Sequence, residues 1–241
     1  MLVAAAVCPC PPLLVPEVAA GAAPELDAAR DACADAVGVL AASRPDLLVV
    51  VGPAPTGADG TYHPGTPGSF RGFGADLTVR LGTGPAREPD QEPARELPYS
   101  LSVAAWLLSR ARWDACPVEG AAVTEDLAPE RAVELGRRTA TRAGRVALLV
   151  MGDGSACRGV KAPGYLDERA EGFDALAARA LGAADTAALK ALDAPLAREL
   201  KAAGRAPWQV LAGAAEDTSA AGRLLYDEAP YGVGYLVAAW T

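Results

Sequence analysis

Residues 2–16, LVAAAVCPCPPLLVP, contain the segment on which the predicted fold depends. The seven small apolar residues 2–8 are typical of a buried strand. Pro9 ends this strand, because proline has no backbone N–H donor and fixes φ. The thiols of Cys8 and Cys10 therefore lie at the carboxyl end of a first strand. Open α/β sheets bind their ligands at this end of their strands, so we expect a site here.

A helix and a second strand follow the first strand. Residues 24–42 carry apolar side chains at helical spacing, and residues 47–51, LLVVV, are typical of a strand covered on both faces. This order predicts a right-handed crossover and parallel pairing. Residues 83–96 are polar and predict an excursion at the surface. Further strands are expected at residues 73–81, 116–123, 146–151, 224–226 and 233–240, and helices at residues 98–112, 129–143 and within 168–204. We predict a single α/β domain over residues 1–241, with a mostly parallel central sheet flanked by helices.

Two loops are expected at the carboxyl ends of strands. Residues 52–74 lack periodicity and contain Tyr62 and His63, and a loop of this length is often functional. The GDGS sequence after the strand that starts VALL contains Asp153 and Ser155. Loops at strand ends often carry binding or catalytic residues, so these four side chains are pocket candidates. For Asp153 and Ser155 the alternative is a capping role.

Composition and charge exclude several classes of protein. Hydrophobic residues make up 51% of the 241 residues, and the net charge of −8 comes without any basic run, which argues against nucleic acid and membrane surfaces as partners. No stretch approaches the roughly 18 apolar residues of a membrane span, and we expect no secretory leader. The five cysteines predict a reduced, cytoplasmic protein in which Cys33, Cys116 and Cys157 are small buried hydrophobes.

Few residues offer reactive chemistry. Cys8 and Cys10 form a C-x-C pair, and two thiolates can bind Zn or Cu(I) or cycle through a disulfide, although both can equally be core residues. His63, the single histidine, can act as a general acid or base, or is simply solvated. Glu228 lies between two expected strands near Tyr231, where a carboxylate is either a solvated turn residue or a ligand.

Four segments together resemble one family. They are CPCPPLLVPE near the start, MGDGSACR after a mid-chain strand, APGYLDERAEGFD following it and YDEAPYGVGYLVAAW at the end. In this order they are similar to the class III extradiol ring-cleavage dioxygenases of the B type, and the G-V-G-Y segment is the most distinctive. The resemblance implies an α/β fold with a non-haem Fe(II), held by two histidines and a glutamate, that cleaves catechol rings with dioxygen.

Most residues to which the resemblance assigns chemistry are replaced. The first histidine ligand falls at Cys10, the second at Ala54 and the catalytic histidine at Ala156, whereas the glutamate ligand is retained as Glu228. His63 is offset from both ligand positions. An iron oxygenase needs three firm ligands, and a Cys, an Ala and a Glu do not supply them. The base that takes the catechol proton, a group typically worth about 10²–10⁴-fold in rate, is missing as well.

We therefore predict a non-catalytic member of the family, a pseudoenzyme that binds a small molecule or a protein partner and has no resident cofactor. An alternative is an enzyme with a repurposed site, in which Cys10, with Cys8, His63 or Glu228, holds Zn or Cu(I) or acts as a nucleophile. A third hypothesis is a structural or assembly component, including a homo-oligomer. The pocket candidates are Cys8, Cys10, Ala54, Tyr62, His63, Asp153, Ser155, Ala156 and Tyr231, and the candidate metal ligands are Cys10 and Glu228.

Overall fold

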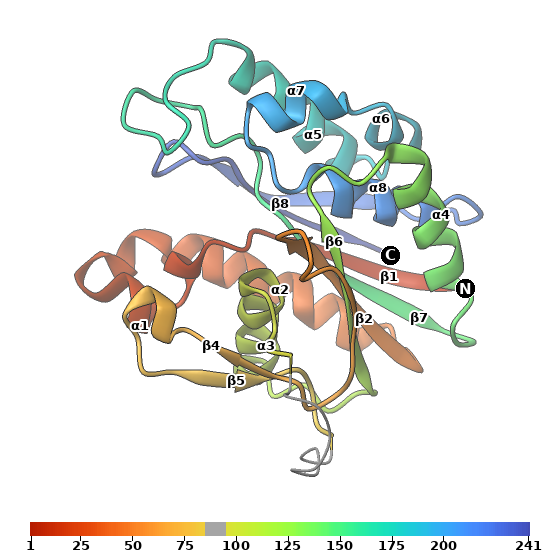
Figure 1. Ribbon diagram of the computed structural model, residues 1–241. Helices are drawn as coiled ribbons and strands as arrows, with labels where there is room; N and C mark the ends of the chain where they lie inside the picture. The colour runs from red at the N-terminus through yellow and green to blue at the C-terminus, as the bar shows by residue number, and fades with distance from the viewer. Residues whose placement is uncertain (85–94) are drawn as a thin grey trace.

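A seven-stranded mixed sheet forms the centre of the molecule, in a computed structural model that describes residues 1–84 and 95–241 (Figure 1). In spatial order its strands are β3 (Gly60–Tyr62), β6 (Val118–Thr124), β2 (Leu47–Ala54), β7 (Val146–Met151), β1 (Leu2–Cys8), β9 (Tyr235–Trp240) and β8 (Gly222–Glu228). The strands β6, β2, β7 and β1 run parallel, whereas β3, β9 and β8 pair antiparallel with their neighbours. The predicted α/β fold with a mostly parallel central sheet is confirmed.

Helices cover both faces of the sheet, as Figure 1 shows. One face packs against α2 (Asp27–Ala42) and α3 (Tyr99–Arg110), the other against α4 (Pro129–Ala140), α5 (Arg169–Gly182) and α8 (Arg205–Ala214). Side chains of β1 alternate between the two faces, because successive residues of a strand point to opposite sides: Ala6 and Cys8 meet α2 and α3, and Val7 meets the other layer.

Smaller elements complete the chain. They are α1 (Pro16–Ala19), α6 (Thr186–Lys190), α7 (Ala194–Glu199), the short sheet of β4 (Pro67–Ser69) and β5 (Thr78–Arg80), and the 3-10 helices Pro12–Leu14, Ala20–Leu26 and Arg71–Phe73. Within the described ranges, no helix combines the length and the apolar composition that crossing a bilayer requires.

Several expected elements are corrected by the structure. Residues 52–74 are not structureless, because β2 continues to Ala54 and the loop then adds β3 and β4. The strand expected at residues 73–81 shrinks to β5, since a 3-10 turn ends at Gly74 with a left-handed φ of 84°. The polar segment 83–96, expected at the surface, falls mostly outside the described residues.

Helix positions differ from expectation in two places. The helix expected from residue 24 begins at Asp27, because Pro24 lies inside the preceding 3-10 helix. Helix α8 is absent from the prediction. All ten of its residues are buried and only Arg205 and Gln209 are polar, so its sequence has too little of a polar face to produce the alternation by which a surface helix is recognised.

Candidate functional site

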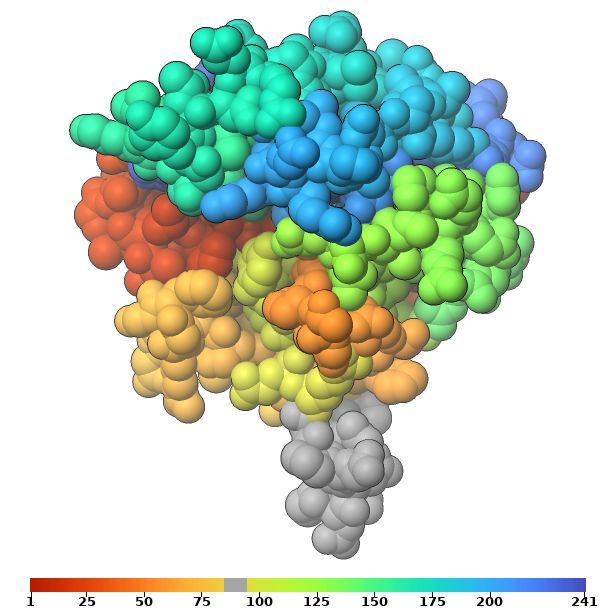
Figure 2. All heavy atoms as spheres, turned by 45° about the horizontal axis from the view of Figure 1, so that its top comes forward, coloured from red at the N-terminus to blue at the C-terminus, as the bar shows by residue number. Residues whose placement is uncertain are grey.

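The carboxyl ends of the parallel strands bring several polar side chains to one edge of the sheet. Cys10 follows β1, Glu125 follows β6 and Asp153 follows β7. Because β1, β7, β2 and β6 run parallel, these three residues leave the sheet at the same edge. In Figure 2 the red amino-terminal segment, the light green segment near residue 125 and the blue segment near residue 200 meet on the visible face.

Cys10 and Asp153 form the centre of this edge. The backbone N–H of Cys10 donates to Oδ1 of Asp153 at 2.8 Å, and the Sγ of Cys10 lies 3.9 Å from Oδ2. The main chain around Asp153 is fixed from both sides: Gly152 N donates to the carbonyl of Cys8 at 3.0 Å, and Gly204 N donates to the carbonyl of Asp153 at 2.8 Å. The carboxyl group is therefore held in place against the thiol.

The surroundings raise the pKa of both groups. Asp153 keeps some contact with solvent, but protein surrounds it on most sides, and this burial raises its pKa to about 7, although the bonds from Cys10 act in the opposite direction. Cys10 is fully buried, and burial together with the negative charges of Asp153 and Glu125 raises its pKa well above its usual range. At neutral pH the thiol is protonated, so it is a poor nucleophile and a poor metal ligand.

Two tyrosines complete the group. Tyr99, the first residue of α3, lies beside Cys10, and its pKa is raised by the ionised form of Cys10, by burial and by the charge of Asp153. Tyr235, the first residue of β9, is buried, and burial and the charge of Asp153 raise its pKa. We call Cys10, Tyr99, Glu125, Asp153 and Tyr235 the strand-end cluster.

Glu125 is placed by a buried arginine. Arg205, at the start of α8, donates to the main-chain carbonyls of Glu125 and of Leu127, the latter at 2.6 Å. Its side chain is buried, and burial lowers the pKa of its guanidinium. Glu125 itself remains exposed at the rim of the cluster. Helix α8 thus fixes both the Asp153 loop, through Gly204, and the segment that follows β6.

A buried carboxylate explains one glycine in each of the GDGS and GVGY segments. Asp174 of α5 accepts the N–H of Ser155 at 2.7 Å and pairs with Arg158 at 3.1 Å. A Cβ at Gly234 would lie 2.4 Å from Oδ2 of Asp174, and one at Gly154 would lie 2.7 Å from Oδ1. Only residues without a side chain allow the two segments to approach Asp174 this closely.

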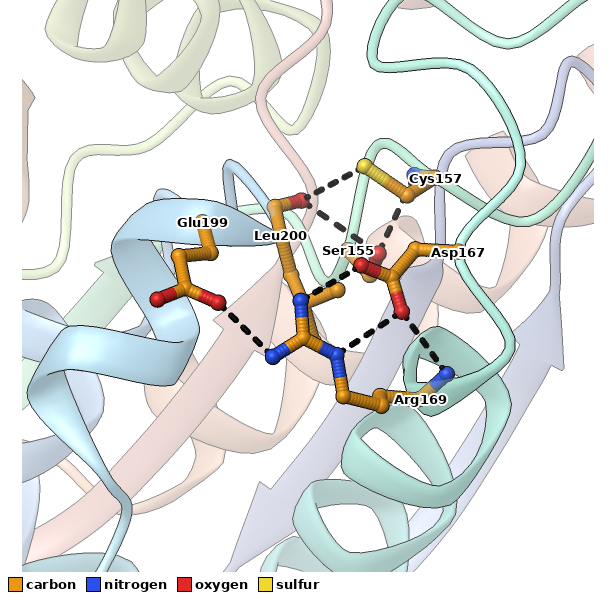
Figure 3. A network of polar contacts seen from close by, with 6 residues as sticks. All are labelled: Ser155, Cys157, Asp167, Arg169, Glu199 and Leu200. Carbon is orange, nitrogen blue, oxygen red and sulfur yellow. Dashed lines mark hydrogen bonds and ion pairs between the residues drawn. The ribbon is translucent and has the colours of Figure 1, made fainter.

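The hydroxyl of Ser155 is engaged in hydrogen bonds within the protein, as Figure 3 shows. Its hydroxyl donates to the carbonyl of Leu200 at 3.3 Å and accepts the N–H of Cys157 at 3.0 Å. The thiol of Cys157 donates to the same carbonyl at 3.5 Å. Beside them Arg169 pairs with Asp167 and with Glu199 of α7. These bonds tie the loop after β7 to the end of α7.

The other predicted site residues lie at various distances from the cluster. Cys8 and Ala54 are buried at the ends of β1 and β2, in the same core layer as Cys10, and Ala156 is buried with its N–H bonded to the carbonyl of Leu200. Tyr231 donates its hydroxyl to Glu25 at 3.0 Å.

The remaining candidates take no part in the hydrogen bonds between Cys10 and Asp153. Tyr62 is buried beneath the guanidinium of Arg95 and donates its hydroxyl to the carbonyl of Ala58 at 2.8 Å. His63 is exposed beyond β3, and Glu228 is exposed at the end of the edge strand β8. Within residues 1–84 and 95–241, no hydrogen bond or ion pair joins His63 or Glu228 to Cys10.

Sequence reasoning missed Tyr99, Glu125, Asp174 and Tyr235. One signal was available for Glu125, because it directly follows a predicted strand, in the same relation as Asp153 to β7. Asp174 lies within a predicted helix and gave no signal, since its importance depends on glycines about 20 and 60 residues away in sequence.

Fold and site together define an α/β protein with a polar cluster at the carboxyl ends of its parallel strands, where such folds bind ligands. The chain is similar to the crystal structure of an uncharacterised protein, JW3007, from Escherichia coli K12, with a TM-score of 0.59, 14% sequence identity and 99% of both chains covered. At this identity the similarity concerns the fold alone. No family model matches the chain, and no curated protein matches it either.

Proposed function

We propose that the chain is a non-catalytic protein with a dioxygenase-like scaffold that binds a small polar molecule at the strand-end cluster. The observation that carries this proposal is the pair of Cys10 and Asp153. Where the resemblance expects the first iron ligand, the chain has a buried, protonated thiol beside a carboxyl group. The cluster offers hydrogen-bonding groups in place of metal ligands.

The residues present do not fit the Fe(II) that the resemblance implies. The protonated thiol of Cys10 is a poor ligand, Ala54 has no donor atom, and Glu228 is exposed at the carboxyl end of the edge strand β8, opposite Tyr235 of β9. In the part of the chain that the structure describes, no three His, Cys, Asp or Glu side chains form a group able to hold a metal ion. We therefore derive no reaction step through iron.

The chemistry of the cluster favours a neutral ligand with hydroxyl groups. The hydroxyl of Tyr99 and the thiol of Cys10 can donate hydrogen bonds, and the carboxyl of Asp153 can donate or accept one near pH 7. An anion would be repelled by Glu125 and by the ionised form of Asp153. Aromatic diols, the substrate class that the resemblance implies, have this chemistry, and catechol is therefore a suitable probe.

Calorimetric titration with catechol, in buffer freed of metal, tests the proposal. We expect saturable binding at one site, weakened at least about tenfold by Asp153→Ala, because a hydrogen bond to a charged group is worth about 1.5–3 kcal/mol. Asp76→Ala, which removes an exposed carboxylate paired with Arg71, serves as the control and should bind like the wild type. Absence of saturable binding, or equal binding by the Asp153→Ala variant, contradicts the proposal.

One observation favours a second candidate, an enzyme with a repurposed site. A carboxyl group with a pKa of about 7 is suited to general acid–base catalysis at neutral pH, and Asp153 is such a group. Asp153 would then act with Cys10, its hydrogen-bond partner among the described residues. Titration of fast-reacting thiols in the wild type and in Cys10→Ser checks this candidate, because a nucleophilic Cys10 would give one fast thiol that the variant lacks.

We also propose a cytoplasmic location, because all five cysteines are free thiols.

A further inference from the structure

A groove of about 890 Å³ lies on the other end of α3, away from the strand-end cluster. Its lining residues come from β5, from the carboxyl-terminal half of α3 and from Glu17 of α1. β5 and α3 lie in the lower part of Figure 1. Its apolar lining residues include Leu77, Val79 and Leu108. The polar and aromatic residues of the groove that carry the inference are Arg80, Trp106, Arg110, Arg112 and Trp113.

Contacts hold two of the arginines on the groove. The guanidinium of Arg110 lies 5.1 Å from the ring centre of Trp106, a cation–π contact. Arg80 donates from Nη1 to the carbonyl of Gly65 at 3.0 Å, which leaves its other N–H groups available. Trp106 is 5% exposed, so it fixes the position of Arg110 more than it offers a surface of its own.

The end of α3 places the third arginine and the second tryptophan. Trp113 N donates to the carbonyl of Leu108 and Arg112 N to that of Ser109, each at 3.0 Å, and Arg112 has a left-handed φ of 51°. This is the Schellman arrangement of a helix end. The indole Nε1 of Trp113 donates to the carbonyl of Cys116 at 3.0 Å, which holds the half-buried ring at the groove.

The charge of the groove is opposite to that of the protein. Three guanidinium groups line it against the single carboxylate of Glu17, in a chain whose net charge is −8. Among the described residues, none of the three arginines forms an ion pair. A cation at the carboxyl end of a helix interacts favourably with the helix dipole, and Arg110 provides that cation for α3. Neither the helix dipole nor an ion pair among the described residues explains the charges of Arg80 and Arg112.

We propose that this groove binds a small phosphorylated molecule that carries a planar ring, of which a nucleotide is the simplest example. Guanidinium groups bind phosphate oxygens in pairs of charge-assisted hydrogen bonds. The volume is within the range of small-molecule sites and exceeds what a lone phosphate fills, and Trp113 with the apolar side chains of Leu77 and Val79 gives the ring a place to pack. A long polyanion is disfavoured, because the chain as a whole carries a net charge of −8.

The groove is independent of the strand-end cluster. Tyr99 begins α3 at the cluster and Arg110 ends it at the groove, and a helix of 12 residues is about 18 Å long. Ligand binding at one place can therefore succeed or fail without the other.

Calorimetric titration of the full chain with ADP, ribose 5-phosphate and pyrophosphate tests the proposal, at low and at high salt. ADP should bind saturably and more tightly than the other two, and added salt should weaken it. The double variant Arg110→Gln/Arg112→Gly should bind ADP at least about tenfold more weakly, since it loses two charge-assisted partners. Glycine suits the left-handed φ of residue 112, so this variant keeps its backbone.

Arg44→Gly is the matched control. Arg44 follows α2 as Arg112 follows α3, has a φ of 48° and is exposed, but it lies outside the groove. Its variant should bind ADP like the wild type. Absence of saturable binding of all three ligands at millimolar concentration overturns the proposal, as does unchanged affinity in the double variant. Equal affinity for ADP and pyrophosphate overturns the inference that the ligand carries a planar ring.

Discussion

Replacing Asp153 with asparagine is expected to stabilise the protein above neutral pH. Asparagine has nearly the same shape as a protonated aspartate, and its Oδ1 can still accept the N–H of Cys10, which now lies 2.8 Å from Oδ1 of Asp153. The substitution therefore removes the ability to ionise and little else.

The magnitude follows from the pKa of Asp153, which is about 7 in the folded chain and 3.8 for an ordinary aspartate. Because the folded pKa is raised, the protonated carboxyl favours folding. Its contribution is complete below about pH 4 and is lost as the pH rises to about 7. At about 1.4 kcal/mol for each pKa unit, the loss is about 4 kcal/mol. The asparagine variant does not titrate and escapes this loss.

Urea unfolding of both proteins between about pH 4 and about pH 8 measures the effect. The free energies of unfolding should be similar at the acidic end, and the variant should be more stable by up to about 4 kcal/mol at the alkaline end. Taking the difference between the two proteins cancels the titration of all other groups. A difference that stays constant with pH, or one that favours the wild type as the pH rises, refutes the assignment of a raised pKa to Asp153.

Two further predictions concern the loop glycines and the thiols. Gly234→Ala should lower the free energy of unfolding by about 1–3 kcal/mol in urea titrations, because its Cβ would lie 2.4 Å from Asp174. Gly159→Ala is the control and should cost far less, because a Cβ there would have no neighbour within 4 Å. Equal effects of the two substitutions would contradict the close packing around Asp174. In the native protein at neutral pH, a thiol reagent followed by peptide mass mapping should label Cys116, which is half-buried, well before Cys10, and early labelling of Cys10 would contradict its raised pKa.

The core of the fold could be predicted from the sequence because its strands are continuous apolar runs with abrupt ends. Residues 2–8 stop at a proline and residues 146–151 stop at a glycine, and both match β1 and β7. Helix α8 could not be predicted in the same way. It is buried all round between α4, α6 and the sheet, and periodicity identifies only helices that have one polar face.

The candidate site could be predicted in part. Cys10 and Asp153 each follow a strand, and parallel pairing brings strand ends together, which accounts for their contact. Tyr99 begins a helix and Tyr235 begins a strand far away in sequence, and local sequence does not show that both lie near Asp153. Asp174 depends on contacts between three segments, which only the folded chain reveals.

Oxygen consumption tests the central claim most directly, namely that the strand-end cluster binds without cleaving rings. The purified protein is mixed with one equivalent of Fe(II) and excess catechol, and dissolved oxygen is followed with an electrode. We predict the same rate as with iron and catechol alone, because Cys10, Ala54 and Ala156 stand where the resemblance requires three histidines. Catalytic oxygen uptake that depends on the protein would contradict the claim.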